Sequence, residues 1–242
     1  MNSEISDTKT EKNYQSQYVA SLFNSIANTY DFLNHVLSGG IDFYWRRRAL
    51  KLLDNPFPKN ILDVASGTGD FAIAAAKAGG KMIYGIDIAE KMLDIGKSKI
   101  RNKGLTGKIK LEIGKAEALI FEENSFDSAI VAFGVRNFEN LEKGLSEMHR
   151  VVKTSGKILV LEFSKPKAFP IKQIYFFYFK RILPLLGKLI SKHHEAYSYL
   201  PNTVMQFPEG DDFLKILNQT GFKETEQRRL TFGIASVYIG IK

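Results

Sequence analysis

The stretch that most constrains the fold is residues 61–71, ILDVASGTGDF, in which an aliphatic run leads into two closely spaced glycines. Aliphatic and β-branched residues favour a buried strand, and glycine supplies the positive φ angles that a tight turn after a strand needs. A helix-forming run, Asp70–Ala78, follows directly. A strand, a glycine turn and a helix in this order are typical of a nucleotide-like cofactor site in an α/β protein.

The rest of the chain continues this alternation of strand and helix patterns. Strands are predicted at residues 60–65, 81–88, 108–114, 126–134 and 156–164, and helices at Asp70–Ala78, Glu90–Asn102, 141–152 and 210–221. Two last strand-like runs, at residues 223–230 and 232–242, are expected to form an antiparallel hairpin at the sheet edge. We therefore predict an α/β, Rossmann-like fold with a seven-stranded, mostly parallel sheet, an antiparallel last strand and helices on both faces.

At 242 residues the chain is long enough for one α/β domain with its own core. Residues 1–13 are predicted to be a disordered arm, and residues 14–242 a single domain. Within the domain we expect an N-terminal helical cap over residues 14–57 and a helical lid insertion over residues 165–208. The polar start shows no secretory pattern and no apolar run reaches the roughly 18 residues that span a bilayer, so a cytoplasmic protein is expected.

The net charge of +8 is concentrated in the predicted insertion. Between residues 165 and 192 there are seven Lys or Arg residues and no acid, and six aromatic residues lie between residues 169 and 179. Basic residues that flank an apolar face of helical spacing favour an interfacial helix drawn to anionic lipid. The alternative is a lid that packs over the active site, and the two interpretations are compatible.

The glycine loop raises the question of which cofactor it holds. Residues 67–72, GTGDFA, also satisfy the dinucleotide pattern G-x-G-x-x-G/A, and Asp87 lies 20 residues after the first glycine. However, Asp63 precedes the loop and Asp70 stands at the helix N-terminus, where their carboxylates would repel a pyrophosphate. S-adenosylmethionine carries a sulfonium and an ammonium but no phosphate, so it suits this loop. The competing interpretation is that both acids only cap the turn and the helix.

Residues in other strand-end loops complete the predicted cofactor site. Met92 can pack against the adenine or belong to the helix core, and the backbone of Lys115 and Ala116 can meet the adenine edge. Together with the terminal strand pair, these features resemble the class I S-adenosylmethionine-dependent methyltransferases over residues 58–165 and 209–242. The predicted cofactor-binding residues are Asp63, Gly67, Thr68, Gly69, Asp87, Met92, Lys115, Ala116, Ala132 and Phe133.

Four further stretches resemble the quinone-biosynthesis C-methyltransferases, which make menaquinone or ubiquinone. They are residues 30–47 (YDFLNHVLSGGIDFYWRR), 133–140 (FGVRNFEN), 150–166 (RVVKTSGKILVLEFSKP) and 197–208 (YSYLPNTVMQFP). Leu33, Asp42 and Lys115 depart from that family's usual residues, as does KTSG at residues 153–156. The resemblance implies C-methylation of a polyprenylated quinol, namely demethylmenaquinol to menaquinol, with a 2-methoxy-6-polyprenyl-benzoquinol of ubiquinone biosynthesis as the alternative.

A hydroquinone ring carbon becomes a strong nucleophile as the ring hydroxyl loses its proton, and a neighbouring cation favours that ionisation. Arg136 is predicted at the carboxyl end of a central strand, where open α/β sheets bind ligands. We expect Arg136 and Asn137 to hold the developing oxyanion, and Tyr30 and Asp31 to orient the ring. A surface salt bridge is the competing interpretation of Arg136.

Three other functions compete with this interpretation. A nucleic-acid methyltransferase would account for the charge, but such enzymes usually carry an Asp/Asn-Pro-Pro-aromatic run where this chain has FGVRNFEN, so no nucleic-acid partner is expected. A non-catalytic S-adenosylmethionine-binding assembly protein would keep the glycine loop without needing Arg136 and Asn137. A dehydrogenase is the third.

No metal ion is expected, because the histidines are not clustered in the sequence. His35 and His149 are isolated, His193 and His194 are adjacent, and all four are predicted to be solvated or capped. The expected partners are a lipid-soluble quinol and the anionic inner face of the plasma membrane, where the cytoplasmic protein would associate peripherally. A homo-oligomer and a complex with other biosynthetic proteins both stay open.

Overall fold

A computed structural model describes residues 16–31, 35, 38–53, 56–182 and 194–242. The predicted disordered arm lies outside the described residues, and so do Leu33 and His193. The side chain of His194 is also not described.

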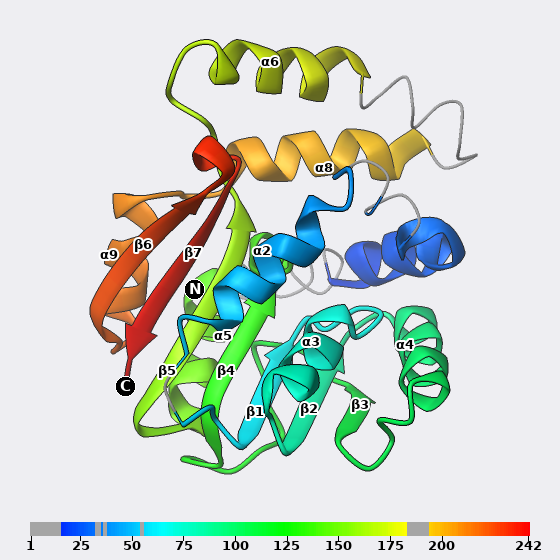
Figure 1. Ribbon diagram of the computed structural model, residues 1–242, viewed down its shortest axis with the longest axis vertical. Helices are drawn as coiled ribbons and strands as arrows, with labels where there is room; N and C mark the ends of the chain where they lie inside the picture. The colour runs from blue at the N-terminus through cyan, green and yellow to red at the C-terminus, as the bar shows by residue number, and fades with distance from the viewer. Residues whose placement is uncertain (1–15, 32–34, 36–37, 54–55, 183–193) are drawn as a thin grey trace, which may run out of the picture.

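One seven-stranded sheet, in the order β3-β2-β1-β4-β5-β7-β6, forms the centre of the protein (Figure 1). The strands are β1 (Asn60–Val64), β2 (Met82–Asp87), β3 (Ile109–Ile113), β4 (Phe126–Ala132), β5 (Val152–Phe163), β6 (Lys223–Leu230) and β7 (Ala235–Ile241). The first five are parallel to one another, whereas β7 runs antiparallel to both β5 and β6. The predicted sheet and its terminal hairpin are confirmed.

Helices cover both faces of the sheet, as predicted. In the described residues, α2 (Ile41–Leu50), α3 (Asp70–Ala78) and α4 (Glu90–Asn102) pack on one face, and α5 (Leu141–Val151) and α9 (Asp211–Gln219) on the other. Each face of the sheet has its own hydrophobic core, and successive strand residues point to the two cores alternately. Ile61 belongs to the core under α2, α3 and α4, and Leu62 to the core under α5 and α9. Because both faces are covered, the central strands are apolar throughout.

The fifth strand is longer than the sequence predicts. It begins at Val152, directly after α5, and not at residue 156. Val152 pairs with Phe126 of β4, and a register shift follows before the regular pairing of Ser128 with Lys157. The four extra residues are mostly polar and exposed, so they lack the apolar residues by which the sequence analysis identifies a strand.

A further layer of helices lies above the carboxyl ends of the parallel strands (Figure 1). Residues 16–31 form one of these helices, and the segment predicted as a lid supplies α6 (Ile171–Phe177) and α8 (His194–Gln206). The short helix η3 (Thr231–Gly233) joins β6 to β7 beneath α6. The carboxyl edge of the sheet is therefore covered by chain segments that lie outside the alternating strand–helix pattern.

Candidate active site

The glycine loop between β1 and α3 adopts the turn that its composition predicts. Gly67 and Gly69 have φ angles of +54° and +77°, which lie in the left-handed region that glycine tolerates best. The loop is anchored to the sheet by a hydrogen bond of 2.9 Å from the Ser66 backbone N–H to the carbonyl oxygen of Ile86. The turn thus fixes the start of α3 at the carboxyl edge of the sheet.

Asp87, at the end of β2, supports this loop. Its Oδ2 accepts a hydrogen bond of 2.8 Å from the Gly67 backbone N–H, and its Oδ1 accepts one of 2.8 Å from the Ala89 backbone N–H. Burial raises the pKa of Asp87, and these two backbone donors oppose that rise. Each carboxylate oxygen can still accept a further hydrogen bond, so Asp87 can serve the loop and a ligand together.

Asp63 is a buried carboxyl group of β1 with no hydrogen-bond partner in the described part of the chain. Burial raises its pKa to about 8; the dipole of the Ala72 backbone N–H and the charge of Arg46 oppose that rise, and the charges of Asp87 and Asp70 add to it. A buried polar group without a partner in a folded protein calls for an explanation. A cationic ligand bound at the glycine loop would supply the missing charge.

A cavity of about 70 Å³ lies between this loop and the helix of residues 16–31. Eight predicted residues line it: Tyr30, Gly67, Asp87, Met92, Ala116, Ala132, Phe133 and Asn137. Four predicted cofactor residues do not: Asp63 lies buried, Thr68 and Gly69 lie elsewhere in the loop, and the ammonium of Lys115 lies 3.7 Å from the Glu139 carboxylate. The structure thus gathers most of the predicted residues.

The volume of this cavity is well below the roughly 300–1,000 Å³ typical of small-molecule sites. The helix of residues 16–31 makes it small, because Val19, Phe23 and Tyr30 reach into it. A nucleoside-sized ligand is therefore larger than this cavity, and these three side chains are among those that limit its volume.

Arg136 lies in the short helix η1 (Val135–Asn137), which follows β4. Its Nη1 donates hydrogen bonds of 2.7 Å to Glu162 Oε1 and 2.6 Å to the carbonyl oxygen of Phe133, and its side chain is only 5% exposed. The competing interpretation, a surface salt bridge, is wrong because the ion pair is buried. Arg136 Nε is also buried and has no partner among the described residues.

Glu162, the partner of Arg136, is a site residue that the sequence reasoning missed. It is fully buried in β5, its Oε1 also accepts a hydrogen bond from the Phe163 backbone N–H, and its Oε2 has no partner in the described residues. Burial raises its pKa, and the Arg136 guanidinium opposes that rise. The sequence feature that could have identified Glu162 is its position as the only acid in the otherwise apolar run of residues 158–163.

Asn137 faces the cofactor cavity and is held by a second missed residue. The Tyr199 hydroxyl, from α8, donates a hydrogen bond of 3.0 Å to Asn137 Oδ1. Tyr199 also packs edge-on against Tyr18 and Phe23 of the N-terminal helix. The predicted insertion therefore reaches the site through one side chain of the YSYLPN motif.

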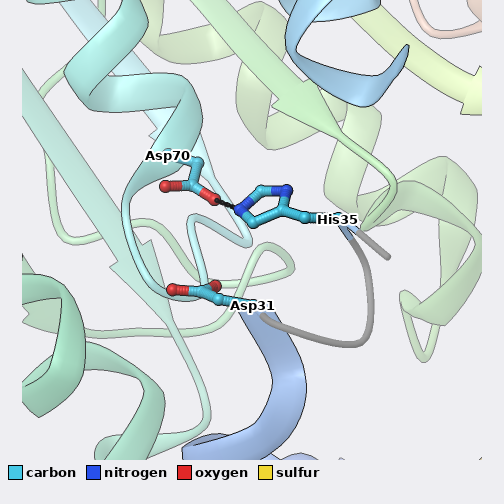
Figure 2. Close-up of side chains that lie close together, drawn as sticks. All are labelled: Asp31, His35 and Asp70. Atoms are coloured by element: carbon cyan, nitrogen blue, oxygen red, sulfur yellow. Dashed lines mark ion pairs between the residues drawn. The ribbon is translucent and has the colours of Figure 1, made fainter. Parts of the chain in front are cut away.

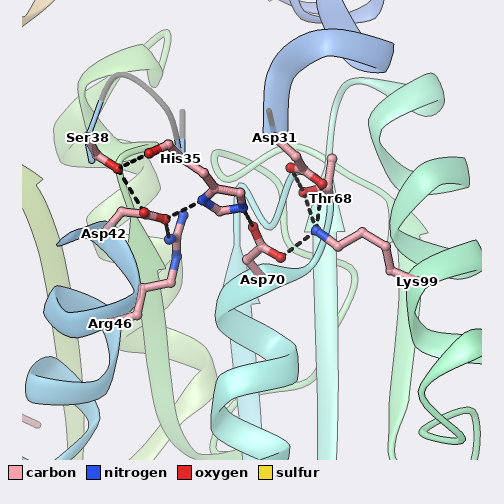
Figure 3. Close-up of polar contacts among 8 residues, drawn as sticks. All are labelled: Asp31, His35, Ser38, Asp42, Arg46, Thr68, Asp70 and Lys99. Carbon is pink, nitrogen blue, oxygen red and sulfur yellow. Dashed lines mark hydrogen bonds and ion pairs between the residues drawn. The ribbon is translucent and has the colours of Figure 1, made fainter. Parts of the chain in front are cut away.

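Asp31 takes part in a polar network on the other side of the glycine loop (Figure 3). Its carboxylate accepts hydrogen bonds of 2.5 Å from the Thr68 hydroxyl and 2.7 Å from the Lys99 ammonium. Lys99 also pairs with Asp70. The structure thus joins Asp31 to the loop and to α4 and does not bring it to Arg136.

His35 is isolated in the sequence and predicted to be solvated or capped, but in the structure it lies next to two carboxylates. Its Nδ1 lies 2.9 Å from Asp42 Oδ2, and its Nε2 lies 3.5 Å from Asp70 Oδ2. Asp31, His35 and Asp70 come close enough together to hold a metal ion (Figure 2). However, the Lys99 ammonium already lies between the two carboxylates, so a metal ion would have to displace it.

The strand order, the glycine loop and the acid after the second strand define a class I S-adenosylmethionine-dependent methyltransferase. A solved S-adenosylmethionine-dependent methyltransferase from Thermotoga maritima shares the fold, with a TM-score of 0.65 and 18% identity over 92% of this chain and 99% of that one. S-adenosylmethionine is the cofactor of this class.

The chain belongs to the ubiE/COQ5 methyltransferase family, whose sequence profile matches residues 10–242. It is 46% identical to the demethylmenaquinone methyltransferase of Bacteroides fragilis, over 94% of each chain. It is 44% identical to the ubiquinone/menaquinone biosynthesis C-methyltransferase UbiE of Geotalea daltonii, over 93% of this chain and 96% of that one. The predicted family is confirmed.

Proposed function

We propose that this protein transfers the methyl group of S-adenosylmethionine to a ring carbon of demethylmenaquinol and so makes menaquinol. Relatives named demethylmenaquinone methyltransferase match the chain at 46% and 39% identity over nearly its whole length. A second candidate acceptor is the polyprenyl-benzoquinol of ubiquinone biosynthesis, which relatives named for both quinones favour.

The observation that carries the proposal is the buried Arg136 beside the cofactor cavity. Its neighbour Asn137 lines that cavity, and Arg136 Nε is a buried donor without a partner in the described chain. A guanidinium with a free, desolvated N–H suits an anionic oxygen of the acceptor. Glu162 orients the guanidinium from the opposite side and is not available to the acceptor through Oε1, which is already bonded.

The chemistry follows from these positions. When bound, S-adenosylmethionine supplies the methyl group as an electrophile. Arg136 lowers the free energy of the quinol anion, so negative charge on the ring oxygen raises the nucleophilicity of the neighbouring ring carbon. Asn137, fixed by Tyr199, orients the ring. The ring carbon would form its new bond to the methyl group as the sulfur–methyl bond breaks, leaving the electron pair on the sulfur of S-adenosylhomocysteine. The same ring carbon would then lose its proton to water, which restores the aromatic ring.

The predicted cofactor residues fit S-adenosylmethionine. We assign Asp63 to the cationic end of the cofactor and Asp87 to the ribose hydroxyls. Met92 and Ala116 line the cavity where the adenine would pack, and Gly67 allows the backbone to approach the ligand closely. The Asp63 carboxyl group supports this assignment, because both of its oxygens are buried without a hydrogen bond in the described chain and a cationic ligand would stabilise its ionised form.

One assay tests the proposed function. Purified protein is incubated with methyl-labelled S-adenosylmethionine and each reduced precursor in detergent, and the label is followed into the quinol. We expect label in demethylmenaquinol. Label in the benzoquinol alone would transfer the proposal to the second acceptor, and label in neither would overturn it.

We also infer that the protein docks on an anionic membrane surface through α6. Phe169, Ile174 and Phe177 are each more than 60% exposed, and Lys167 and Lys172 are exposed beside them. Exposed apolar and basic side chains on one segment favour the interface of an anionic bilayer. In the described residues, no helix is long and apolar enough to cross a membrane.

Co-sedimentation with vesicles tests the docking. We expect the protein to pellet with vesicles that contain anionic lipid and to be released by high salt, because salt screens the basic residues. Replacing Phe169 and Phe177 with Ser should reduce the bound fraction, whereas replacing the distant, exposed Ile120 with Ser should not. Failure of the wild-type protein to bind at low salt would remove the inference.

A further inference from the structure

An apolar cavity of about 480 Å³ lies under α6, outside the cofactor site. Its walls come from α2, from α6 and the short helix Tyr178–Ile182 that follows it, from α8 and η3, and from the end of β5. Figure 1 shows where these elements lie. The side chains that define it include Trp45, Phe163, Ile171, Tyr175, Phe179 and Ile234. No charged side chain lines it within the described chain, and a cavity of this size and polarity suits an apolar small-molecule group.

A layer of three aromatic rings connects this cavity to the cofactor site. Phe133 lines the cofactor cavity, whereas Trp45 and Phe163 line the apolar one. The Phe133 and Phe163 ring centroids lie 4.6 Å apart, and Trp45 lies 6.0 Å from Phe133 and 6.1 Å from Phe163. At this point the two cavities are therefore separated by two rings in contact, Phe133 and Phe163.

Arg136 lies at the same boundary. Its guanidinium carbon is 5.6 Å from the centroid of the Phe163 ring. The Tyr175 hydroxyl, in the wall of the apolar cavity, is buried and has no hydrogen-bond partner among the described residues. The apolar cavity thus has a buried hydroxyl in its wall, and its Phe163 wall lies against Arg136 of the proposed oxyanion site.

The cavity reaches the surface through apolar side chains. Ile174 and Phe232 both line the cavity and are 61% and 77% exposed. Phe169 and Phe177, which we assign to the membrane surface, lie on the same segment as Ile174. The opening is therefore continuous with the proposed lipid-facing surface.

We propose that this cavity binds the isoprenoid chain of the quinol. The proposal rests on the proposed function and adds the site that recognises the chain. The quinol ring would lie beside Arg136, the first isoprene units would fill the cavity, and the remainder would leave between Ile174 and Phe232 toward the membrane. Burying branched hydrocarbon against aromatic and aliphatic walls is favourable in proportion to the area removed from water.

Trp45 makes the cavity directly observable, because it is the only tryptophan of the chain and it lines the cavity. It is 2% exposed, and its indole N–H donates a hydrogen bond of 2.7 Å to the Thr231 hydroxyl. A short isoprenoid alcohol that is brominated across its double bonds carries no quinol ring, and bromine quenches tryptophan on contact. We expect saturable quenching of Trp45 by the brominated alcohol and none by the unbrominated one. No saturable quenching would overturn the proposal.

Kinetics test whether the same cavity serves the substrate. Ile171→Trp and Ile174→Trp each place a larger side chain in the cavity from α6. Ile120→Trp makes the same change at an exposed site that lines neither cavity. For each protein we measure kcat/KM for demethylmenaquinol and for a naphthoquinol without the chain. We expect the preference for the prenylated substrate to fall about tenfold or more in the α6 variants. The larger side chain occupies space that the isoprenoid chain would fill, so less hydrocarbon is buried. The Ile120→Trp preference should equal that of the wild type.

Two outcomes of the kinetics contradict the proposal: an unchanged preference in both α6 variants, or an equal loss on both substrates. Failure of the proposed function looks different, because the wild-type protein would then methylate neither quinol while the quenching measurement still reports on the cavity. Unfolding curves of the three variants identify any that are destabilised. The two α6 positions then provide independent tests.

Discussion

The two cavities differ in how the chain builds them. The cofactor cavity is formed mainly by loops at the carboxyl ends of parallel strands, and backbone hydrogen bonds fix the position of Asp87 within it. The apolar cavity is formed by helices that belong to the N-terminal cap and to the insertion, and apolar packing defines its walls. The first cavity is about 70 Å³ and the second about 480 Å³.

This difference indicates that the two cavities recognise different parts of the reactants. The sheet edge presents charged groups at fixed positions, as recognition of a polar cofactor requires. The helical segments present a deformable apolar surface, as recognition of a flexible hydrocarbon chain requires. The two cavities meet at Phe133, Phe163 and Arg136, so the reaction belongs at their boundary. The following substitutions test each side of that boundary.

Loss of Arg136 should have the largest effect. Arg136→Met alone would leave the buried Glu162 without a charged partner, at a cost of about 3–5 kcal/mol of stability. The double variant Arg136→Met/Glu162→Gln removes both charges and should fold. We expect its turnover to fall by about 10²–10³-fold, because one preorganised donor to a developing oxyanion contributes about that much. Binding of S-adenosylmethionine, measured by calorimetry, should stay close to that of the wild type.

The single variant Glu162→Gln is the matched control for that double variant, because it keeps the guanidinium and removes only the buried carboxylate. Its turnover should exceed that of the double variant by at least about tenfold, since the oxyanion donor is still present. Equal turnover of the double variant and the wild type would disprove the role of Arg136.

Asp63→Asn should have the next largest effect, on the cofactor cavity. We expect the affinity for S-adenosylmethionine to fall by about 10–100-fold, since a buried hydrogen bond to a charged group contributes about 1.5–3 kcal/mol. Wild-type affinity should rise as the pH is raised toward 8, because the pKa of Asp63 is about 8 and the ionised form binds the cation. Calorimetry at several pH values measures both. Asp212→Asn, an exposed site on α9, is the control.

The same carboxyl group should make the ligand-free protein less stable as pH rises. In the unfolded chain Asp63 ionises near its ordinary pKa of 3.8, whereas in the folded protein it stays protonated up to about 8. Between these values the folded state holds the extra proton, so raising the pH favours unfolding. Asp63→Asn lacks this effect, and its free energy of unfolding should fall less between pH 4 and pH 8. Identical pH profiles would contradict the raised pKa.

The sequence predicts the cofactor side of the protein better than the acceptor side. Residues 61–71 identify a strand, a turn and a helix because each residue type has a local preference, and Asp87 follows from the spacing of a βαβ unit. The glycine loop and the alternation of strands and helices can therefore be predicted from residues that are close together in the sequence. Most predicted cofactor residues do reach one cavity.

Long-range contacts account for what the sequence reasoning missed. Glu162 pairs with Arg136 across 26 positions, Tyr199 reaches Asn137 across 62, and Trp45 bonds to Thr231 across 186. No periodicity encodes such pairs, because they depend on how helices pack above the sheet. The pairing of His35 with Asp42 and Asp70 was missed for a related reason: the three residues come from separate elements.

Tyr199→Phe should have a modest effect at the boundary between the cavities. The variant keeps the ring packing against Phe23 and removes only the hydroxyl that holds Asn137. A single hydrogen bond contributes about 0.5–1.5 kcal/mol, so we expect kcat/KM for the quinol to fall by about 2–10-fold. Tyr44→Phe, at an exposed site on α2, should leave the kinetics unchanged. If Tyr199→Phe also leaves them unchanged, Asn137 does not need this anchor.

Asp31→Asn should have the smallest effect, and it separates two roles for this residue. The part-exposed Asp31–Lys99 ion pair joins the N-terminal helix to α4, and such pairs contribute at most about 1 kcal/mol. If Asp31 only holds the helix closed over the cofactor, the variant should release S-adenosylmethionine up to about fivefold faster with little change in turnover. If Asp31 orients the quinol ring, turnover should fall sharply instead. Stopped-flow release and steady-state turnover distinguish these roles, with Asp94→Asn, which breaks an exposed ion pair on α4, as the control.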